Sequence, residues 1–340
     1  MISVGALTSG RDVPSTRFRI RQFIESLADN GVVVREYRPF IDKYSTPPGA
    51  LLGPLWTAAK LTSRLPGLLG ARRSDVVWIE RELLAGRFTL EGFIPGSSVL
   101  DVDDAIWLTG DPGYSERIAR RCAGVIAGNS YIAEHYRAFT PAVWIVPTCV
   151  DTDRWRPRAR VDGRPWTIGW IGSASNLQYL EAVEQPVAEF LTRHEDARLL
   201  IVADRPPAFH ELPDRRWRYE KWSAEREVDL VSQFDLGLMP LPNTEWARGK
   251  CGAKMLLYMA SGIPSLVTPL GSNVDILERG QVGLGALGPD DWASALERFY
   301  GDRSFAAECG REGRRVALEF LSVKANVGRL AGIFEQVARG

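Results

Sequence analysis

The sequence predicts an α/β protein with two doubly wound parallel sheets, one in each half of the chain. Short apolar runs recur along the sequence, and each is followed by a segment of helix length. The runs are continuous rather than alternating, which is typical of parallel strands covered by helices on both faces. The length of 340 residues, of which 45% are hydrophobic and 25% charged, suits two domains of about 150 residues each.

The first half contains six such runs, which we expect to be the strands of an N-terminal Rossmann-like domain at residues 1–150. They are Ile2–Leu7, Val32–Tyr37, Asp75–Ile79, Val99–Val102, Gly124–Ala127 and Ala142–Val146. The series stops in residues 151–165, where Arg, Asp and Pro are frequent and apolar residues are few. We expect this segment to be a linker.

The second half repeats the pattern over residues 166–320, where we expect a second, C-terminal Rossmann-like domain. Its expected strands are Thr167–Ile171, Arg198–Val202, Asp235–Met239, Pro264–Val267 and Val282–Leu284. A last helix within residues 321–340 is a candidate for packing back on the N-terminal domain. Ligands of doubly wound sheets bind beyond the carboxyl ends of the strands, so we expect the substrate site in a cleft between the two domains.

Composition argues against several other kinds of protein. Lys plus Arg and Asp plus Glu both number 42, so the chain lacks the basic excess that bulk nucleic-acid binding needs. The four cysteines are scattered and form no zinc motif, which suits free thiols in a reducing cytoplasm. The N-terminal residues do not resemble a signal peptide, and no run approaches about 18 apolar residues. These features favour a cytoplasmic protein.

One segment of the second domain carries the strongest signal for a ligand. Gly249 and Gly252 open an expected helix, whose free N–H groups and positive dipole end suit an anion. Arg248, Lys250 and Lys254 are expected at the same end. Cations oppose the dipole there, and a bound diphosphate would stabilise them. The alternative is a basic turn exposed to water.

Two other loops follow expected strands and have residues suited to phosphate. Gly172 allows close approach of a ligand, and Ser173 can donate to a phosphate oxygen, although the GxGxxG fingerprint of nicotinamide binding is absent. The loop after the first strand is long and polar, which is typical of functional loops. Its candidates for contact with donor phosphates or acceptor are Ser15, Thr16, Arg17 and Arg19.

A group of carboxylates follows the strand Val99–Val102, and we call Asp101, Asp103 and Asp104 the carboxylate cluster. Close carboxylates repel one another unless they have partners. Arg81, at the end of the preceding strand, is the expected partner. Three interpretations are open: a Mg²⁺ site, a salt-bridged structural cluster, or a catalytic or acceptor-binding site.

Two further segments have competing interpretations. Residues 56–73 mix apolar and basic side chains and suit contact with an anionic membrane surface. Pro66 and Gly67 interrupt this segment, which favours an ordinary packed helix and loop. Trp222 is a candidate for the wall of a nucleotide-base pocket, and the alternative is a core position.

Several motifs together resemble the retaining family 4 glycosyltransferases, which have the GT-B fold. The motifs are Val146–Pro157, Gly169–Ser173, Phe234–Pro242, Lys254–Pro264 and Leu266–Leu277. The resemblance covers nearly the whole chain and implies two Rossmann-like domains that face a cleft. It makes residues 1–150 the acceptor domain and residues 166–320 the nucleotide-sugar domain. It also implies metal-independent transfer, with retention, from a UDP- or GDP-sugar to a glycan, lipid or small-molecule hydroxyl, with no cofactor.

The chain departs from this family at the paired glutamates that contact the donor sugar and ribose. Gly249 and Leu257 stand at the matching positions, and neither can make those contacts. Candidates for these contacts in neighbouring loops are Glu245, Asp275 and Glu278. The family's phosphate-binding Arg and Lys near Gly172 are also missing, so the resemblance makes Arg248, Lys250 and Lys254 the candidate replacements.

In this family a histidine that contacts the donor sugar often follows the strand that leads into the carboxylate cluster. Asp103 stands nearest that position here, and Asp104 is the alternative. The implied role is to orient the acceptor hydroxyl or to stabilise positive charge at the anomeric carbon.

Two other functions stay open at this point. One is a sugar-nucleotide epimerase of the GT-B fold, which would release an epimerised nucleotide sugar without an acceptor. The other is a non-catalytic partner that binds sugar nucleotides for another transferase, which the missing glutamates suggest. Loss of nucleotide binding without loss of cellular function would indicate this second alternative.

Overall fold

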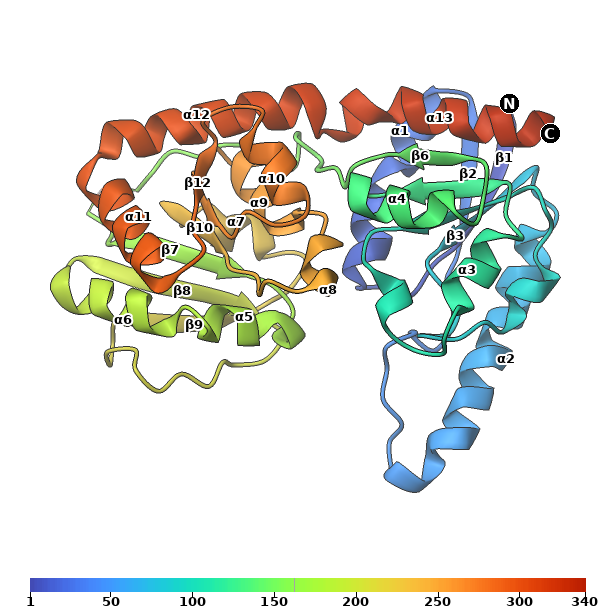
Figure 1. Ribbon diagram of the computed structural model, residues 1–340, viewed down its shortest axis with the longest axis horizontal. Helices are drawn as coiled ribbons and strands as arrows, with labels where there is room; N and C mark the ends of the chain where they lie inside the picture. The colour runs from blue at the N-terminus through green and yellow to red at the C-terminus, as the bar shows by residue number, and fades with distance from the viewer. Residues whose placement is uncertain (162) are drawn as a thin grey trace. The chain divides into compact units, whose positions relative to one another are not determined.

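The computed structural model describes residues 1–161 and 163–340, and the chain divides into two units. Unit 1 contains Met1–Cys149, Arg248–Cys251 and Val323–Gly340, and unit 2 contains Val150–Ala247 and Gly252–Ser322. Residues 151–161 of the expected linker contain no helix or strand, and residue 162 lies outside the described residues. Each unit has its own six-stranded sheet (Figure 1).

The sheet of unit 1 is parallel throughout, with the order β2-β1-β3-β4-β5-β6. Its strands are β1 (Ile2–Leu7), β2 (Val32–Tyr37), β3 (Val76–Glu80), β4 (Ser98–Val102), β5 (Gly124–Ala127) and β6 (Val143–Ile145). The chain runs outward from β1 to β2 and then continues on the other side with β3. The carboxyl ends of β1 and β3 therefore meet at a topological switch point, where ligands of such sheets bind.

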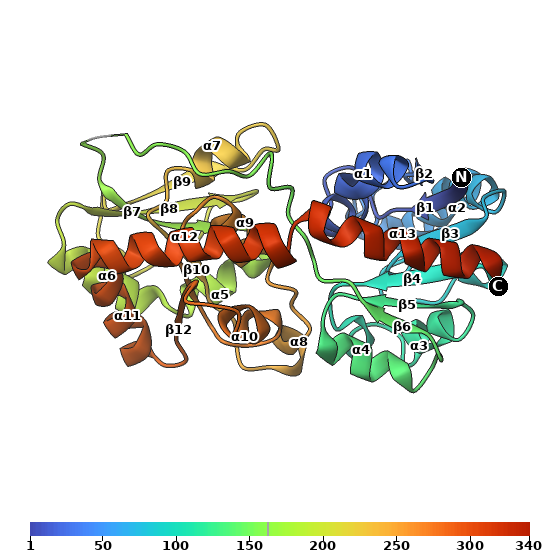
Figure 2. The same ribbon diagram turned by 90° about the horizontal axis from the view of Figure 1, so that it is seen from above.

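Helices cover both faces of this sheet. They are α1 (Ile24–Asp29), α2 (Gly53–Ala71), α3 (Tyr114–Ala119), α4 (Ser130–Arg137) and α13 (Val323–Arg339). One apolar cluster joins Val4 and Trp78 of the sheet to Phe334 of α13, and another joins Ile79 and Leu100 to the opposite helices. Figure 2 shows α13 running along the sheet of unit 1.

The expected interruption of α2 at Pro66 is wrong, because the helix is continuous from Gly53 to Ala71. A proline inside a helix removes one backbone hydrogen bond, so packing must hold the helix together. Gly67 and Gly70 provide that packing, since their missing side chains leave room for Tyr37 at the end of β2.

The sheet of unit 2 is also parallel, with the order β12-β11-β10-β7-β8-β9. Its strands are β7 (Trp166–Ile171), β8 (Ala197–Ala203), β9 (Trp217–Lys221), β10 (Leu236–Met239), β11 (Ser265–Val267) and β12 (Gly283–Gly285). The sequence did not predict β9. The switch point lies between β7 and β10, and the turn that follows β7 is located there.

The helices of unit 2 surround a core rich in aromatic side chains, among them Trp170, Phe190 and Trp292. They are α5 (Leu177–Glu181), α6 (Glu184–Arg193), α7 (Glu227–Val231), α8 (Glu245–Arg248), α9 (Ala253–Ala260), α10 (Ser272–Leu277), α11 (Pro289–Gly301) and α12 (Arg303–Phe320). Arg248, the last residue of α8, is assigned to unit 1. Gly262 follows α9 with φ of 72°, the left-handed conformation expected where a helix stops.

Candidate functional site

The turn after β7 and the start of α9 lie together in unit 2. A Cβ at Gly172 would lie 2.7 Å from Cε of Lys254 and 2.7 Å from the Trp170 ring, so only glycine fits. The Lys254 ammonium lies 5.3 Å from the centroid of that ring, within the range of a cation–π contact. The structure thus brings together two residues that are far apart in the sequence and that we predicted to bind a diphosphate.

Helix α9 begins at Ala253; its N-cap residue, Gly252, has φ of 69°, and no side chain caps the first turn. The first N–H groups of a helix have no partner within the helix, so they are available to an anion. Lys254 stands in this same first turn. A bare glycine turn, the start of a helix and one ammonium group therefore lie together at the switch point of unit 2, and this arrangement suits a phosphate group.

The other candidates in unit 2 lie in several places. Ser173 is exposed, and its hydroxyl accepts a hydrogen bond from Nδ2 of Asn176 at 2.7 Å. The indole of Trp222 is half-buried and donates to the Glu227 carboxylate at 2.9 Å. The carboxylates predicted to contact sugar or ribose are exposed; they are Glu245, Asp275 and Glu278. These assignments stay predictions.

The carboxylate cluster of unit 1 is organised around Arg81. This residue follows β3 with φ of 54°, which is uncommon for a residue other than glycine. Its backbone N–H donates to the Asp101 carbonyl at 2.9 Å. Its guanidinium contacts Asp103 at 2.5 Å and Asp104 at 2.6 Å. The ion pair that the two strand ends predicted is therefore present.

Lys250 is the second cation of this cluster, and its position corrects a prediction. We expected Lys250 at the start of a helix, around a diphosphate, but its ammonium lies 3.1 Å from the Asp104 carboxylate. Residues 248–251 pack within unit 1, where Asn129 Nδ2 donates to the Gly249 carbonyl at 3.2 Å. The reason is electrostatic, because the negative charge of Asp104 attracts the nearest available cation.

The members of the carboxylate cluster differ in exposure and in charge. Burial raises the pKa of Asp101 to about 6, against the attraction of Arg19. Burial also acts to raise the pKa of Asp103, but the attraction of Arg81 and its hydrogen bond prevail and the pKa is lowered. The Asp103 and Asp104 side chains are 14% and 12% exposed, whereas that of Asp101 is 1% exposed. Asp103 and Asp104 can therefore meet a ligand, and Asp101 cannot.

The loop after β1 also corrects a prediction. Arg19 is buried, with Nε 2.8 Å from Asp101 and Nη1 2.8 Å from the Val146 carbonyl, so it supports the fold instead of a ligand. The buried hydroxyls of Ser15 and Thr16 both donate to the Glu80 carboxylate. Because the side chains of Ser15, Thr16 and Arg19 are buried and already have these partners, they are not available to a phosphate group or an acceptor. Arg17 is half-buried, with its guanidinium 5.4 Å from the Phe18 ring centroid.

No group of three or more His, Cys, Asp or Glu side chains within residues 1–161 and 163–340 is arranged to hold a metal ion. No helix in this part of the chain is long and apolar enough to cross a membrane.

Gly249→Ala is expected to displace the 248–251 loop from unit 1. The new Cβ would lie 2.5 Å from the Ala105 backbone nitrogen, and backbone cannot rotate away as a side chain can. We expect the free energy of unfolding to fall by about 1–3 kcal/mol, measured by urea denaturation. Gly328→Ala is the control, because nothing lies within 4 Å of its added Cβ. Equal stability of the two variants would contradict the prediction.

Comparison with known proteins gives one family model and one curated relative. Residues 166–302 match the model described as Glycosyl transferases group 1. The D-inositol 3-phosphate glycosyltransferase of Corynebacterium jeikeium (strain K411) is 26% identical over 234 residues, which cover 61% of this chain and 54% of the relative. The chain thus spans about half the length of this curated relative.

Solved structures resemble the chain over nearly its whole length. Sucrose-phosphate synthase from Thermosynechococcus elongatus has a TM-score of 0.70 at 13% identity, covering 99% of each chain. HepE of Anabaena in complex with UDP-glucose has a TM-score of 0.69 at 13% identity, covering 99% of this chain and 100% of that one. At this identity the likeness shows the fold, and the predicted α/β fold of two domains is confirmed.

Proposed function

Because this chain has the GT-B fold and its residues 166–302 match the glycosyl transferases group 1 model, we propose that it transfers a sugar from a nucleoside diphosphate sugar to an acceptor hydroxyl. The observation that carries this proposal is the site formed by Gly172, Lys254 and the start of α9. It combines close backbone approach, a positive charge and a helix N-terminus that no side chain caps, which are features that bind diphosphates. The complex of HepE with UDP-glucose, on the same fold, supports it.

In this proposal the donor is a UDP- or GDP-sugar, and unit 2 binds it. Lys254 neutralises phosphate charge as the bond to the sugar breaks, and the turn at Gly172 and Ser173 lies against the phosphate oxygens. Trp222 is proposed to contact the base. The candidates for contact with the sugar and the ribose remain Glu245, Asp275 and Glu278. The remaining candidate for contact with phosphate is Arg248.

We assign the reacting side of the acceptor to Asp103 and Asp104 in unit 1. Arg81 pairs with both carboxylates and Lys250 pairs with Asp104, and these ion pairs hold the carboxylates in place. A fixed carboxylate can accept a hydrogen bond from the acceptor hydroxyl or stabilise positive charge at the anomeric carbon. We propose transfer with retention and without a metal, in which the departing phosphate takes the acceptor proton.

The acceptor is proposed to be a glycan, a lipid or a small molecule, and the location the cytoplasm, with contact at the inner face of a membrane. Apolar side chains of α2, among them Leu55 and Leu69, are exposed, which supports such a contact. The even balance of charges argues against a nucleic-acid acceptor.

The proposal is tested by the release of UDP or GDP from a panel of sugar nucleotides in the presence of excess EDTA. Asp103→Asn keeps the size of the side chain and removes its charge. We expect its turnover to fall by about 10- to 100-fold with donor affinity unchanged, because the carboxylate acts on the acceptor or the transition state. Asp111→Asn, an exposed carboxylate of unit 1, is the control. Wild-type turnover in Asp103→Asn would remove Asp103 from the reaction.

A further inference from the structure

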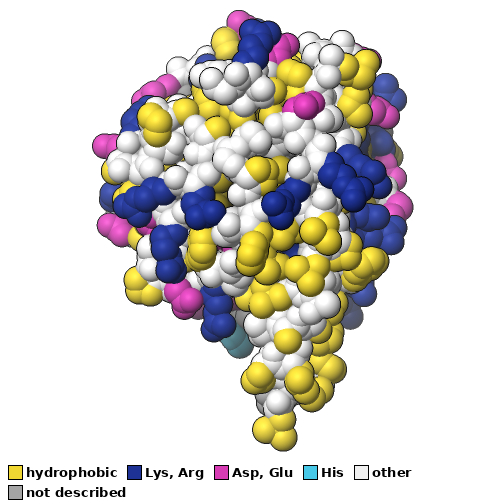
Figure 3. All heavy atoms as spheres, turned by 90° about the vertical axis from the view of Figure 1, so that its right-hand side faces the viewer, with side chains coloured by type: hydrophobic (Ala, Val, Ile, Leu, Met, Phe, Trp, Pro, Cys, Tyr) yellow, Lys and Arg dark blue, Asp and Glu magenta, His cyan; other side chains and the backbone are white. Residues whose placement is uncertain are grey.

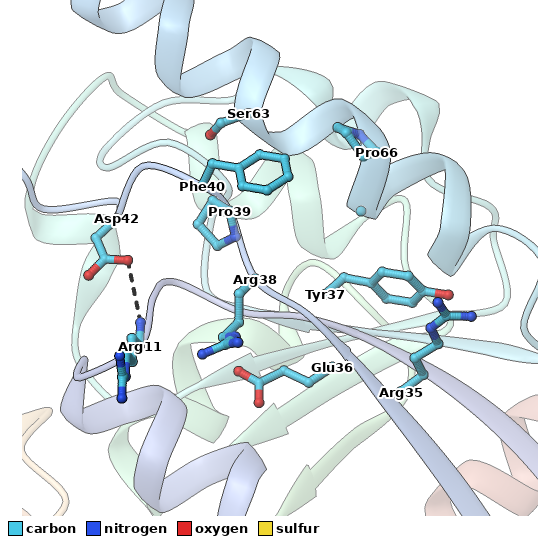
Figure 4. A pocket seen from close by; sticks show the side chains of 11 residues that line it. Arg11, Arg35, Glu36, Tyr37, Arg38, Pro39, Phe40, Asp42, Ser63 and Pro66 are labelled. Atoms are coloured by element: carbon cyan, nitrogen blue, oxygen red, sulfur yellow. Dashed lines mark hydrogen bonds between the residues drawn. The ribbon is translucent and has the colours of Figure 1, made fainter. Parts of the chain in front are cut away.

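Unit 1 contains a pocket that the proposed transfer reaction does not use. Its volume is about 590 Å³, and it lies between the end of β2, the loop that follows and α2 (Figure 4). Arg11, from the loop after β1, closes one side. The pocket shares no lining residue with the carboxylate cluster, Arg81 or Lys250.

Three arginines give the pocket a positive charge, and we call it the arginine pocket: Arg11, Arg35 and Arg38. None of the ion pairs found among residues 1–161 and 163–340 uses their guanidinium groups. Figure 4 shows Arg11 and Arg38 toward one end and Arg35 beside Tyr37 at the other.

The two carboxylates that line the pocket do not cancel this charge. Glu36 is already paired with Arg21 at 2.8 Å and also accepts from the Thr8 hydroxyl at 3.0 Å. Asp42 accepts from the backbone N–H of Arg11 at 3.3 Å. The charged lining residues are thus three arginines and two carboxylates, one of which is already neutralised by Arg21, so the pocket keeps a positive excess that a bound anion would offset.

One wall of the pocket holds Arg35 in a defined arrangement. The Arg35 guanidinium lies 5.2 Å from the Tyr37 ring centroid, in the range of a cation–π contact. Tyr37 is in turn fixed by its close packing against Gly67 and Gly70 of α2. A planar guanidinium that is held in this way presents paired N–H groups, and the oxygens of a phosphate match that geometry.

The surface next to the pocket is apolar. Residues 44–59 contain no charged side chain, and within them Leu51 is 95% exposed and Leu55 70% exposed. Phe40, at the pocket itself, is 85% exposed. Figure 3 shows hydrophobic side chains gathered on the projecting end of α2, with Lys and Arg side chains on the body of unit 1 beside it.

We propose that the arginine pocket is a binding site for a phosphate monoester or diester, separate from the donor site. The phosphate can belong to a soluble molecule or to a lipid headgroup. The exposed apolar end of α2 leads us to expect the lipid. This binding site is proposed in addition to the transfer reaction. Only the purpose that the bound group serves rests on that proposed function.

The test compares two double variants that lose the same charge. Arg35→Ala/Arg38→Ala removes two pocket arginines, and Arg137→Ala/Arg329→Ala removes two exposed arginines of α4 and α13 in the same unit. The soluble probe is glycerol 3-phosphate, measured by calorimetry at fixed ionic strength. The lipid probe is sedimentation with phosphatidylcholine vesicles, with and without phosphatidylglycerol.

We expect the pocket variant to bind at least one probe about tenfold more weakly than the control variant, since each charge-assisted pair contributes about 1.5–3 kcal/mol. A lipid source predicts that Leu51→Ser/Leu55→Ser also lowers vesicle binding. If the phosphate belongs to a soluble molecule, these substitutions are expected to change neither the binding of glycerol 3-phosphate nor the binding of vesicles. Equal losses in the two arginine variants, or no binding of either probe by the wild type, would overturn the proposal. No sugar nucleotide is present, so this failure leaves the proposed transfer untouched.

Discussion

Lys254→Ala is expected to weaken the binding of nucleoside diphosphates by about 100-fold, or about 2.7 kcal/mol. Lys254 is the ammonium group that the structure places beside the bare turn at Gly172 and in the first turn of α9. The substitution leaves the backbone N–H groups of this turn in place but removes the charge proposed to neutralise the diphosphate. Isothermal titration calorimetry with UDP and GDP measures the effect directly.

Two further variants make this result specific. Lys254→Arg keeps the charge and is expected to retain most of the affinity, although its fork is not matched to the space beside Trp170. Arg311→Ala removes an exposed cation from α12 in the same unit and is expected to change nothing. If Lys254→Ala bound diphosphates as the wild type does, the donor site would have to lie elsewhere.

Arg19→Met is expected to lower the free energy of unfolding by about 3–5 kcal/mol, because it leaves the buried Asp101 carboxylate without its ion-pair partner. The two side chains are 2% and 1% exposed, with Nε of Arg19 2.8 Å from Asp101. Trp78 Nε1 still donates to Asp101 at 3.1 Å, but one neutral donor does not replace a guanidinium. Urea denaturation measures the loss.

The pH dependence of this loss separates a missing ion pair from a packing defect. In the wild type, burial raises the pKa of Asp101 from 3.8 to about 6. Between these two pH values Asp101 keeps its proton in the folded chain and loses it in the unfolded chain. The contribution of Asp101 to the free energy of unfolding therefore falls as pH rises. Without Arg19 the pKa rises further, so the deficit of Arg19→Met is expected to shrink from about pH 8 to about pH 5. A deficit independent of pH would contradict this explanation.

Replacing both partners gives a second check. Arg19→Met/Asp101→Leu removes the two charges together, and such a replacement often costs little when the volume is filled. We expect it to be more stable than Arg19→Met alone.

Most of the parallel strands could be predicted from the sequence because central strands buried on both faces must be apolar throughout. β9 was not predicted by this criterion because it is an edge strand. Its residues, Trp217–Lys221, are half-buried or exposed and largely polar. The continuity of α2 could not be predicted from the sequence, because Pro66 by itself indicates a break. The packing of Gly67 and Gly70 on Tyr37, which allows the continuous helix, is a tertiary effect.

The candidate site was predictable only where it depends on the ends of neighbouring strands. The pairing of Arg81 with Asp103 and Asp104 follows from the adjacency of β3 and β4. The pairs Lys250–Asp104 and Arg19–Asp101 join residues that no local pattern connects. Three cations near one helix start therefore suggested a single phosphate site in the sequence, although one of them binds Asp104.

The most direct test of the central claim is the melting temperature of the full chain in the presence of UDP, GDP and their sugars. A ligand at about 100 times its dissociation constant stabilises the folded state by about 2.7 kcal/mol. We predict that at least one nucleoside diphosphate or its sugar raises the melting temperature by several degrees, and that Lys254→Ala loses the rise. No change with any of these ligands would contradict the assignment of unit 2 as a site for sugar nucleotides.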